Sequence, residues 1–98
     1  MKILLVCSAG MSTSILVKKM QEIAGPEDVI EAQALSKGIE TINDWDVCLV
    51  GPQMKFAIPQ LEKATNGKVP ITDIPTHIYG LVDGKGTLEL AKKLYEGK

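Results

Sequence analysis

Short apolar runs and longer helix-like stretches alternate along this sequence, and that alternation is the strongest constraint on its fold. Lys2 to Val6 carries a continuous apolar run, typical of a strand buried on both faces of a sheet. Ser12 to Ala24 follows, with apolar residues at the spacing of one helix face. Ser12 is a suitable N-cap, and Gly25-Pro26 a suitable stop. A strand followed by a helix is therefore predicted at the start of the chain.

The same order recurs through the rest of the sequence. Gly38 weakens one predicted helix, and Pro59 predicts a kink or a late start in the next. Asn66-Gly67 is expected to close that helix. The later elements are strands at Val29 to Leu35, Asp46 to Val50 and Val69 to Ile74, helices at Ser36 to Ile42, Gln53 to Ala64 and Gly86 to Tyr95, a loop or short irregular segment at Pro75 to Gly80, and a turn at Asp83-Gly84.

Four strands that each lead into a helix predict an α/β fold with a parallel sheet between two helical layers. We expect a flavodoxin-like, doubly wound sandwich with strand order 2-1-3-4. In that order the switch point, where open α/β sheets bind ligands, lies between the first and third strands. Cys7 ends the first strand and Gly51 the third. The best nucleophile in the chain is therefore predicted to lie at the crevice.

Size and composition narrow the class of protein. The 98 residues are expected to form a single domain, 1–98, with one core. A net charge of −1 gives nucleic acid no broad electrostatic reason to bind. The apolar start is too short for a secretion signal, and no stretch approaches a membrane span. Two cysteines are not a disulfide framework, which indicates a reducing, cytoplasmic setting. A monomer is the simplest expectation, and no metal-ligand cluster has meaningful spacing.

The segment between the first strand and the first helix has the composition of a phosphate site. Small residues and Gly10 allow the backbone to curl, so that successive N–H groups form an anion nest. The following helix N-terminus adds unpaired N–H donors and a partial positive charge. Hydroxyls add further donors. The predicted phosphate loop comprises Ser8, Ala9, Gly10, Met11, Ser12, Thr13 and Ser14, with Cys7 as the nucleophile whose thiolate form the helix N-terminus favours.

The chemistry at Cys7 is narrowed by the absence of arginine from the chain. Cysteine phosphatases carry a Cys-(x)5-Arg loop, and their low-molecular-weight class places it after the first strand of a similar fold. Here Thr13 occupies the arginine position. Nothing can clamp the phosphoryl group in bidentate fashion. No residue stands out as the base that hydrolysis requires, and Asp83, in a predicted turn, is the only candidate carboxylate. A phosphocysteine should therefore persist, which favours a carrier over a low-molecular-weight phosphatase-like enzyme, the alternative.

Several other interpretations stay open or are weaker. A Ser/Gly-rich turn also serves as a plain connection between a strand and a helix. A receiver domain needs acidic residues at the strand ends, and a thiol-redox module needs a second cysteine near Cys7; both are missing. Gly51-Pro52-Gln53 either shapes the crevice or is a plain turn. His77 and Tyr79 each have either a packing or surface role or a place beside the thiol. Met11, Met54 and Phe56 form either an apolar rim around the thiol or part of the core, and Cys48 is expected to be a core residue.

Three stretches resemble the enzyme IIB subunits of the bacterial sugar phosphotransferase system, lactose/cellobiose (type 3) class. They are Cys7 to Ser14, Val50 to Gln53 with Pro59 downstream, and Tyr79 to Gly84. The resemblance covers nearly the whole chain and implies a single IIB domain without a cofactor. It implies that a phosphohistidine on enzyme IIA donates phosphate to Cys7, which phosphorylates a sugar brought in by the membrane component IIC. Cellobiose or another β-glucoside, chitobiose and lactose all remain open as the sugar.

Overall fold

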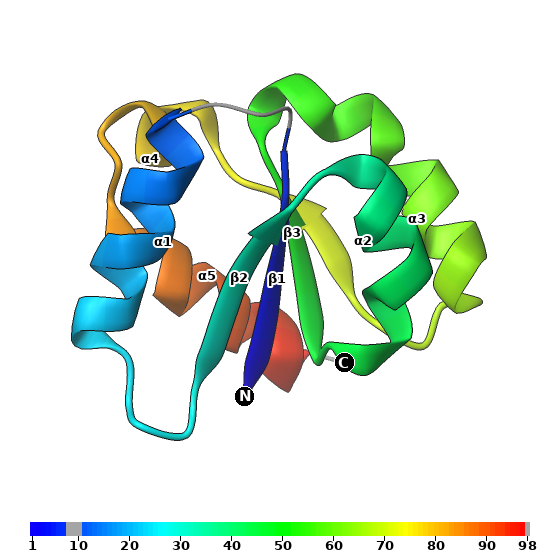
Figure 1. Ribbon diagram of the computed structural model, residues 1–98, viewed down its shortest axis with the longest axis horizontal. Helices are drawn as coiled ribbons and strands as arrows, with labels where there is room; N and C mark the ends of the chain where they lie inside the picture. Colours follow the sequence, from blue (N-terminus) through cyan, green and yellow to red (C-terminus); the bar gives the residue numbers. More distant parts are fainter. Residues whose placement is uncertain (8–10, 98) are drawn as a thin grey trace.

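The computed structural model describes residues 1–7 and 11–97, with Met11 and Ser12 described by their backbone alone. Its centre is one parallel sheet in the order β2-β1-β3-β4, with helices on both faces (Figure 1). The predicted α/β sandwich and its strand order 2-1-3-4 are therefore confirmed. The strands are β1 (Lys2–Val6), β2 (Val29–Gln33), β3 (Val47–Val50) and β4 (Ile71–Asp73).

Two helices cover each face of the sheet, and shorter helices lie at its edges. Helices α1 (Met11–Ile23) and α5 (Gly84–Glu96) pack on one face, and α2 (Leu35–Thr41) and α3 (Ile58–Thr65) pack on the other. In Figure 1, α4 (Thr76–Gly80) lies at the upper edge, where the strands end. The remaining elements are the 3-10 helices η1 (Ile42–Asp44) and η2 (Pro52–Ala57). Among residues 1–7 and 11–97, no helix has the length and apolar character required to cross a bilayer.

The two central strands account for both halves of the core. Alternate side chains of β1 point to opposite faces, so Ile3 and Leu5 meet α1 and α5 while Leu4 and Val6 meet α2 and α3. All four are 0–1% exposed, which explains why this strand reads as an uninterrupted apolar run. Each such side chain stabilises the fold by about 1.5–3 kcal/mol relative to an exposed position. The sheet is thereby held rigid beneath its carboxyl edge.

Two predictions of helix geometry are resolved by packing. Pro59 lies in the first turn of α3, behind the 3-10 helix η2, so the late start is correct and no kink is needed. Gly38 is part of α2 despite its low helix propensity. A Cβ added at Gly38 would lie 2.9 Å from Cγ2 of Val6. The absence of a side chain therefore lets α2 approach β1 directly.

Other predicted boundaries were wrong. Helix α1 begins at Met11, so Ser12 lies within its first turn and is not the N-cap. Asp83 is the N-cap of α5 rather than half of a free turn, since its carboxylate accepts a hydrogen bond from the Gly86 amide at 2.9 Å. Strand β4 is shorter than expected, because only three of its residues pair with β3. Strand β4 therefore spans only Ile71–Asp73.

The segment expected to be a loop at Pro75 to Gly80 forms helix α4. A Schellman-type end closes it: the Asp83 amide donates to the Ile78 carbonyl at 3.0 Å and the Val82 amide to the Tyr79 carbonyl at 3.1 Å. This motif requires a left-handed residue, and Val82 supplies it with φ 50°. A β-branched residue rarely adopts that conformation, so the sequence offers no signal for the motif. The tertiary contacts of α4 hold Val82 in a strained backbone position.

We expect a Thr65→Val substitution to lower the free energy of unfolding by about 1–3 kcal/mol. Thr65 is 1% exposed at the end of α3, where its hydroxyl donates to Asn43 at 2.7 Å and accepts from the Val69 amide at 3.2 Å. Valine preserves the shape but leaves both partners without that hydroxyl. Urea unfolding measures the loss. A Thr76→Val control, at an exposed threonine, should change stability by less than about 0.5 kcal/mol; equal losses would contradict the prediction.

Candidate functional site

Cys7 lies where the carboxyl ends of the four strands meet. Val6 is aligned with Gln33 of β2 and with Val50 of β3, so these strands end level with one another. The Cys7 amide donates to the Gln33 carbonyl at 3.3 Å, and the Gly51 amide donates to the Val6 carbonyl at 3.0 Å. The backbone around Cys7 is thus fixed on both sides. Its side chain is largely covered, with 9% of the residue's surface exposed.

Helix α1 starts four residues after Cys7, at Met11. The first-turn amides of a helix have no intrahelical partner, and they carry a partial positive charge of about +0.5. Met11 and Ser12 contribute backbone to this turn, while Ser14 is exposed on the helix. The predicted loop residues Ser8, Ala9 and Gly10 lie outside the described residues. The described part of the site is therefore a cysteine close in sequence to a helix N-terminus.

Thr13 and Tyr79 join two elements at this edge. Thr13 is 2% exposed in the first turn of α1, and its hydroxyl lies 2.8 Å from the hydroxyl of Tyr79 in α4. The Tyr79 ring also lies beside the end of β3, because a Cβ added at Gly51 would be 3.8 Å from its Cε1 atom. One tyrosine therefore contacts segments that follow both central strands. This pair spans 66 residues of sequence, and no local pattern signals it.

The remaining candidates take different positions. Met54 is buried in the cluster beneath η2, whereas Phe56 is 68% exposed. Of the predicted apolar rim, Met54 is thus a core residue. Gln53 is exposed, but its side-chain oxygen would be 3.1 Å from a Cβ at Gly51, so it folds back over the end of β3. His77 is exposed on α4. Gly51, Gln53 and Tyr79 therefore form one side of the strand-end region.

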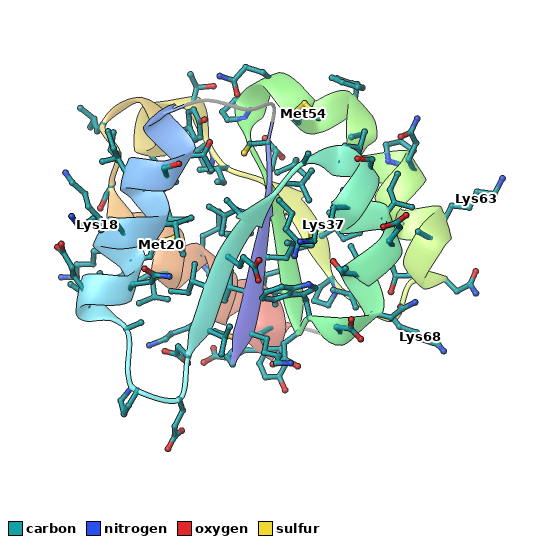
Figure 2. The ribbon with its side chains drawn as sticks, viewed as in Figure 1. Lys18, Met20, Lys37, Met54, Lys63 and Lys68 are labelled. Carbon is teal, nitrogen blue, oxygen red and sulfur yellow. The ribbon has the colours of Figure 1, made fainter. Side chains whose placement is uncertain are left out.

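Two of the lysines labelled in Figure 2 lie away from this edge. Lys18 and Lys63 point outward from the far sides of α1 and α3 (Figure 2), and both are exposed. Because the chain contains no arginine, no guanidinium can reach the Cys7 region. Within residues 1–7 and 11–97, no three His, Cys, Asp or Glu side chains are grouped in a way that would hold a metal ion. The backbone amides at the start of α1 are donors that this edge can offer an anion.

Cys48 is the more deeply buried of the two cysteines. It is 0% exposed in the middle of β3, and burial raises the pKa of its thiol to about 12. A neutral thiol sealed in a core is inert. Both cysteines are free, so no disulfide joins them. The prediction that Cys48 is a core residue is confirmed by its burial.

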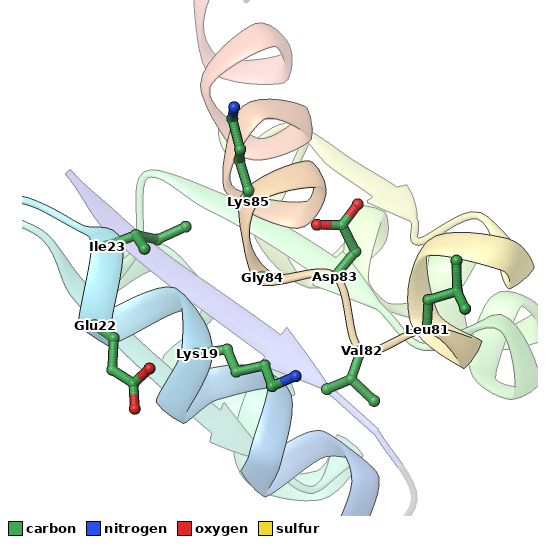
Figure 3. A pocket seen from close by; sticks show the side chains of 8 residues that line it. All are labelled: Lys19, Glu22, Ile23, Leu81, Val82, Asp83, Gly84 and Lys85. Carbon is green, nitrogen blue, oxygen red and sulfur yellow. The ribbon is translucent and has the colours of Figure 1, made fainter.

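A separate hollow of about 460 Å³ lies beside α1 (Figure 3), and Cys7 is not among the residues that line it. Its walls come from α1 and from the connection into α5, and they include Lys19, Glu22, Ile23, Val82, Asp83 and Lys85. The two lysines are matched by two carboxylates, one of which caps α5. The hollow therefore has no net charge and no nucleophile, and the strand-end region remains the candidate site.

Fold and site together define a class: a doubly wound parallel α/β protein with a cysteine at the end of its first strand, just before a helix N-terminus. The model of the family "PTS system, Lactose/Cellobiose specific IIB subunit" matches residues 2–90. The chain belongs to this family. It is therefore a IIB component of the sugar phosphotransferase system (PTS) in the lactose/cellobiose class, as the sequence resemblance indicated.

Individual relatives match over nearly their full length. The chain is 43% identical to the PTS system oligo-beta-mannoside-specific EIIB component of Bacillus subtilis (strain 168), covering 95% of this chain and 94% of the relative. It is 35% identical to the galactose-specific EIIB component of Lactococcus lactis subsp. cremoris (strain MG1363), with 94% of each covered. The solution structure of the cellobiose-specific IIB component of Borrelia burgdorferi is 40% identical, with a TM-score of 0.80, covering 100% of this chain and 94% of that structure.

Proposed function

We propose that this IIB component carries phosphate as a phosphocysteine on Cys7. The position of Cys7 carries the proposal: it is the thiol at the switch point of the sheet, four residues before the start of α1. The other cysteine, Cys48, is 0% exposed, and its raised pKa keeps its thiol neutral. Backbone amides at the start of α1 favour negative charge, which suits both a thiolate and the phosphate it holds.

The first transfer brings phosphate in. The Cys7 sulfur attacks the phosphorus of a phosphohistidine on enzyme IIA, forming an S–P bond as the P–N bond breaks. The histidine nitrogen keeps the bonding electron pair and takes up a proton. In-line transfer of this kind needs positioning and neutralisation of the phosphoryl oxygens more than covalent assistance. We assign that role to the loop Ser8 to Ser14, through its amides and hydroxyls.

The second transfer passes phosphate to the sugar. A sugar hydroxyl held by the membrane component IIC attacks the phosphorus, forming an O–P bond while the S–P bond breaks. Cys7 leaves as a thiolate, and the hydroxyl proton passes to solvent. The carrier works in the cytoplasm, where reducing conditions keep its free thiols intact. A β-linked disaccharide of the cellobiose, chitobiose or lactose class is the proposed acceptor.

Persistence of the phosphate follows from the missing arginine. Hydrolysis requires a clamp on the phosphoryl oxygens and a base that activates water. The chain supplies no arginine, and Thr13 at the corresponding position has its hydroxyl paired with Tyr79. Water attack on the phosphocysteine is therefore expected to be slow compared with transfer to a bound partner.

We expect one phosphate per chain after incubation with phosphorylated IIA. Intact-mass measurement should show this adduct persisting after the donor is removed, with little release of inorganic phosphate. Adding membranes that contain IIC together with cellobiose, chitobiose, lactose or a β-mannoside should discharge the adduct onto one of these sugars. Rapid release of inorganic phosphate without sugar would instead indicate a phosphatase and overturn the proposal.

A further inference from the structure

We propose that Tyr79 is a positioning residue for phosphoryl transfer, acting through Thr13 on the first turn of α1. The inference rests on the proposed function of Cys7. Tyr79 lies on α4, after the last strand, and Thr13 lies six residues after the nucleophile. Their hydroxyls lie 2.8 Å apart and form a hydrogen bond that joins α4 to the start of α1.

The hydroxyl pair is well placed to fix the helix start rather than to meet a partner. Thr13 is 2% exposed, so its hydroxyl would lie buried without a partner if Tyr79 did not reach it. Supplying that partner favours one orientation of the first turn of α1. The amides of this turn are the donors that an anion at Cys7 would use. An error of about 1 Å in such donors is enough to slow a transfer reaction by one to two orders of magnitude.

Tyr79 is held in place by a contact of its ring and by the backbone turn that follows it. Its ring lies beside Gly51, where an added Cβ would be 3.8 Å from Cε1, so the tyrosine rests against the end of β3. On the other side, α4 ends in the strained turn at Val82, whose φ is 50°. Asp83 then begins α5 as its cap. The position of the tyrosine hydroxyl is therefore set by β3 and by the start of α5. Both elements contribute residues to the same core cluster.

The position of Thr13 gives this arrangement its chemical meaning. Counting from Cys7, Thr13 occupies the place where cysteine phosphatases carry their arginine. An arginine there would orient the phosphoryl group by charge and by two parallel hydrogen bonds. In this chain a neutral hydroxyl pair, anchored by Tyr79, holds the same turn in place without adding a positive charge. Positioning is retained while the clamp that assists hydrolysis is absent.

We expect Tyr79→Phe to lower kcat for phosphate uptake from phosphorylated IIA by about tenfold, with KM for the donor within twofold of the wild-type value. Phenylalanine keeps the ring against Gly51 and removes the hydroxyl alone. Thr13→Val should have the same effect, because it removes the other half of the pair. The double variant should lose no more than either single variant, and Thr13→Ser should restore most of the rate.

Three controls separate positioning from general loss of stability. Thr65→Val removes a buried hydroxyl at the opposite edge of the sheet and should lower the melting temperature without lowering kcat. Tyr95→Phe changes the other tyrosine and should also leave kcat unchanged. A Tyr79→Phe protein with wild-type kcat, or losses that multiply in the double variant, would overturn the inference. If the wild-type protein itself accepts no phosphate, the proposed function fails instead.

Discussion

Replacing Cys7 by serine should abolish the phosphate adduct altogether. A serine hydroxyl is neutral near pH 7 and becomes nucleophilic only beside a positioned base. The hydrogen bond described for Cys7 is made by its backbone amide, so no base is bonded to this position to take up that proton. Serine is close to cysteine in size and leaves the end of β1 intact. The experiment is intact-mass measurement of each variant after incubation with phosphorylated IIA, alongside urea unfolding to verify the fold.

Cys48→Ser is the matched control, since it makes the same chemical change at the other cysteine. The phosphate adduct should form at the wild-type level, because this thiol is sealed in β3 with its pKa raised to about 12. Burying a hydroxyl there will cost about 1–3 kcal/mol of stability. Cys48→Ala avoids that cost and should give the same result. An adduct that survives Cys7→Ser, or disappears with either Cys48 variant, would contradict the assignment of Cys7.

The fold was predictable because its signals are local and repeated. Strand β1 is buried on both faces, so its apolar run has no interruption that could suggest another element. The order 2-1-3-4 was expected by analogy with flavodoxin-like folds, and right-handed crossovers between four consecutive strand–helix units are compatible with it. Helix α4 could not be predicted, because its end depends on a left-handed Val82, and a valine in sequence argues against that conformation. Tertiary packing decides such turns.

The candidate site was predictable in part, for a similar reason. Cys7 is marked by its place at the end of a predicted strand and before a predicted helix, both of which are found. The pairing of Thr13 with Tyr79 is a long-range contact between elements that touch only in the folded chain. The sequence identifies each residue as a candidate, but it does not indicate that the two are in contact. Composition and spacing therefore locate the proposed nucleophile, while the contact between Thr13 and Tyr79 requires coordinates.

We expect Gly84→Val to lower the free energy of unfolding by about 3 kcal/mol or more, the largest stability effect considered for this chain. Gly84 opens α5 directly against the backbone of α1. An added Cβ would lie 3.0 Å from the carbonyl carbon of Lys19 and 3.0 Å from the Met20 nitrogen. Backbone atoms cannot rotate aside as a side chain can, so the two helices must separate. Figure 3 shows Gly84 where the chain enters α5, facing α1.

Gly80→Val is the matched control, because the same side chain is introduced only four residues earlier. A Cβ at Gly80 meets nothing described within 4 Å, and its φ is not in the left-handed region. Stability should change by less than about 0.5 kcal/mol, since valine is no worse than glycine in a helix. Urea unfolding compares the two.

Because α1 carries Thr13 at its start, separating α1 from α5 should also slow phosphate uptake at temperatures where the Gly84→Val protein is still folded. Equal stabilities for the two variants would show that α5 can shift without cost, and would remove the close helix contact as the reason for glycine at position 84.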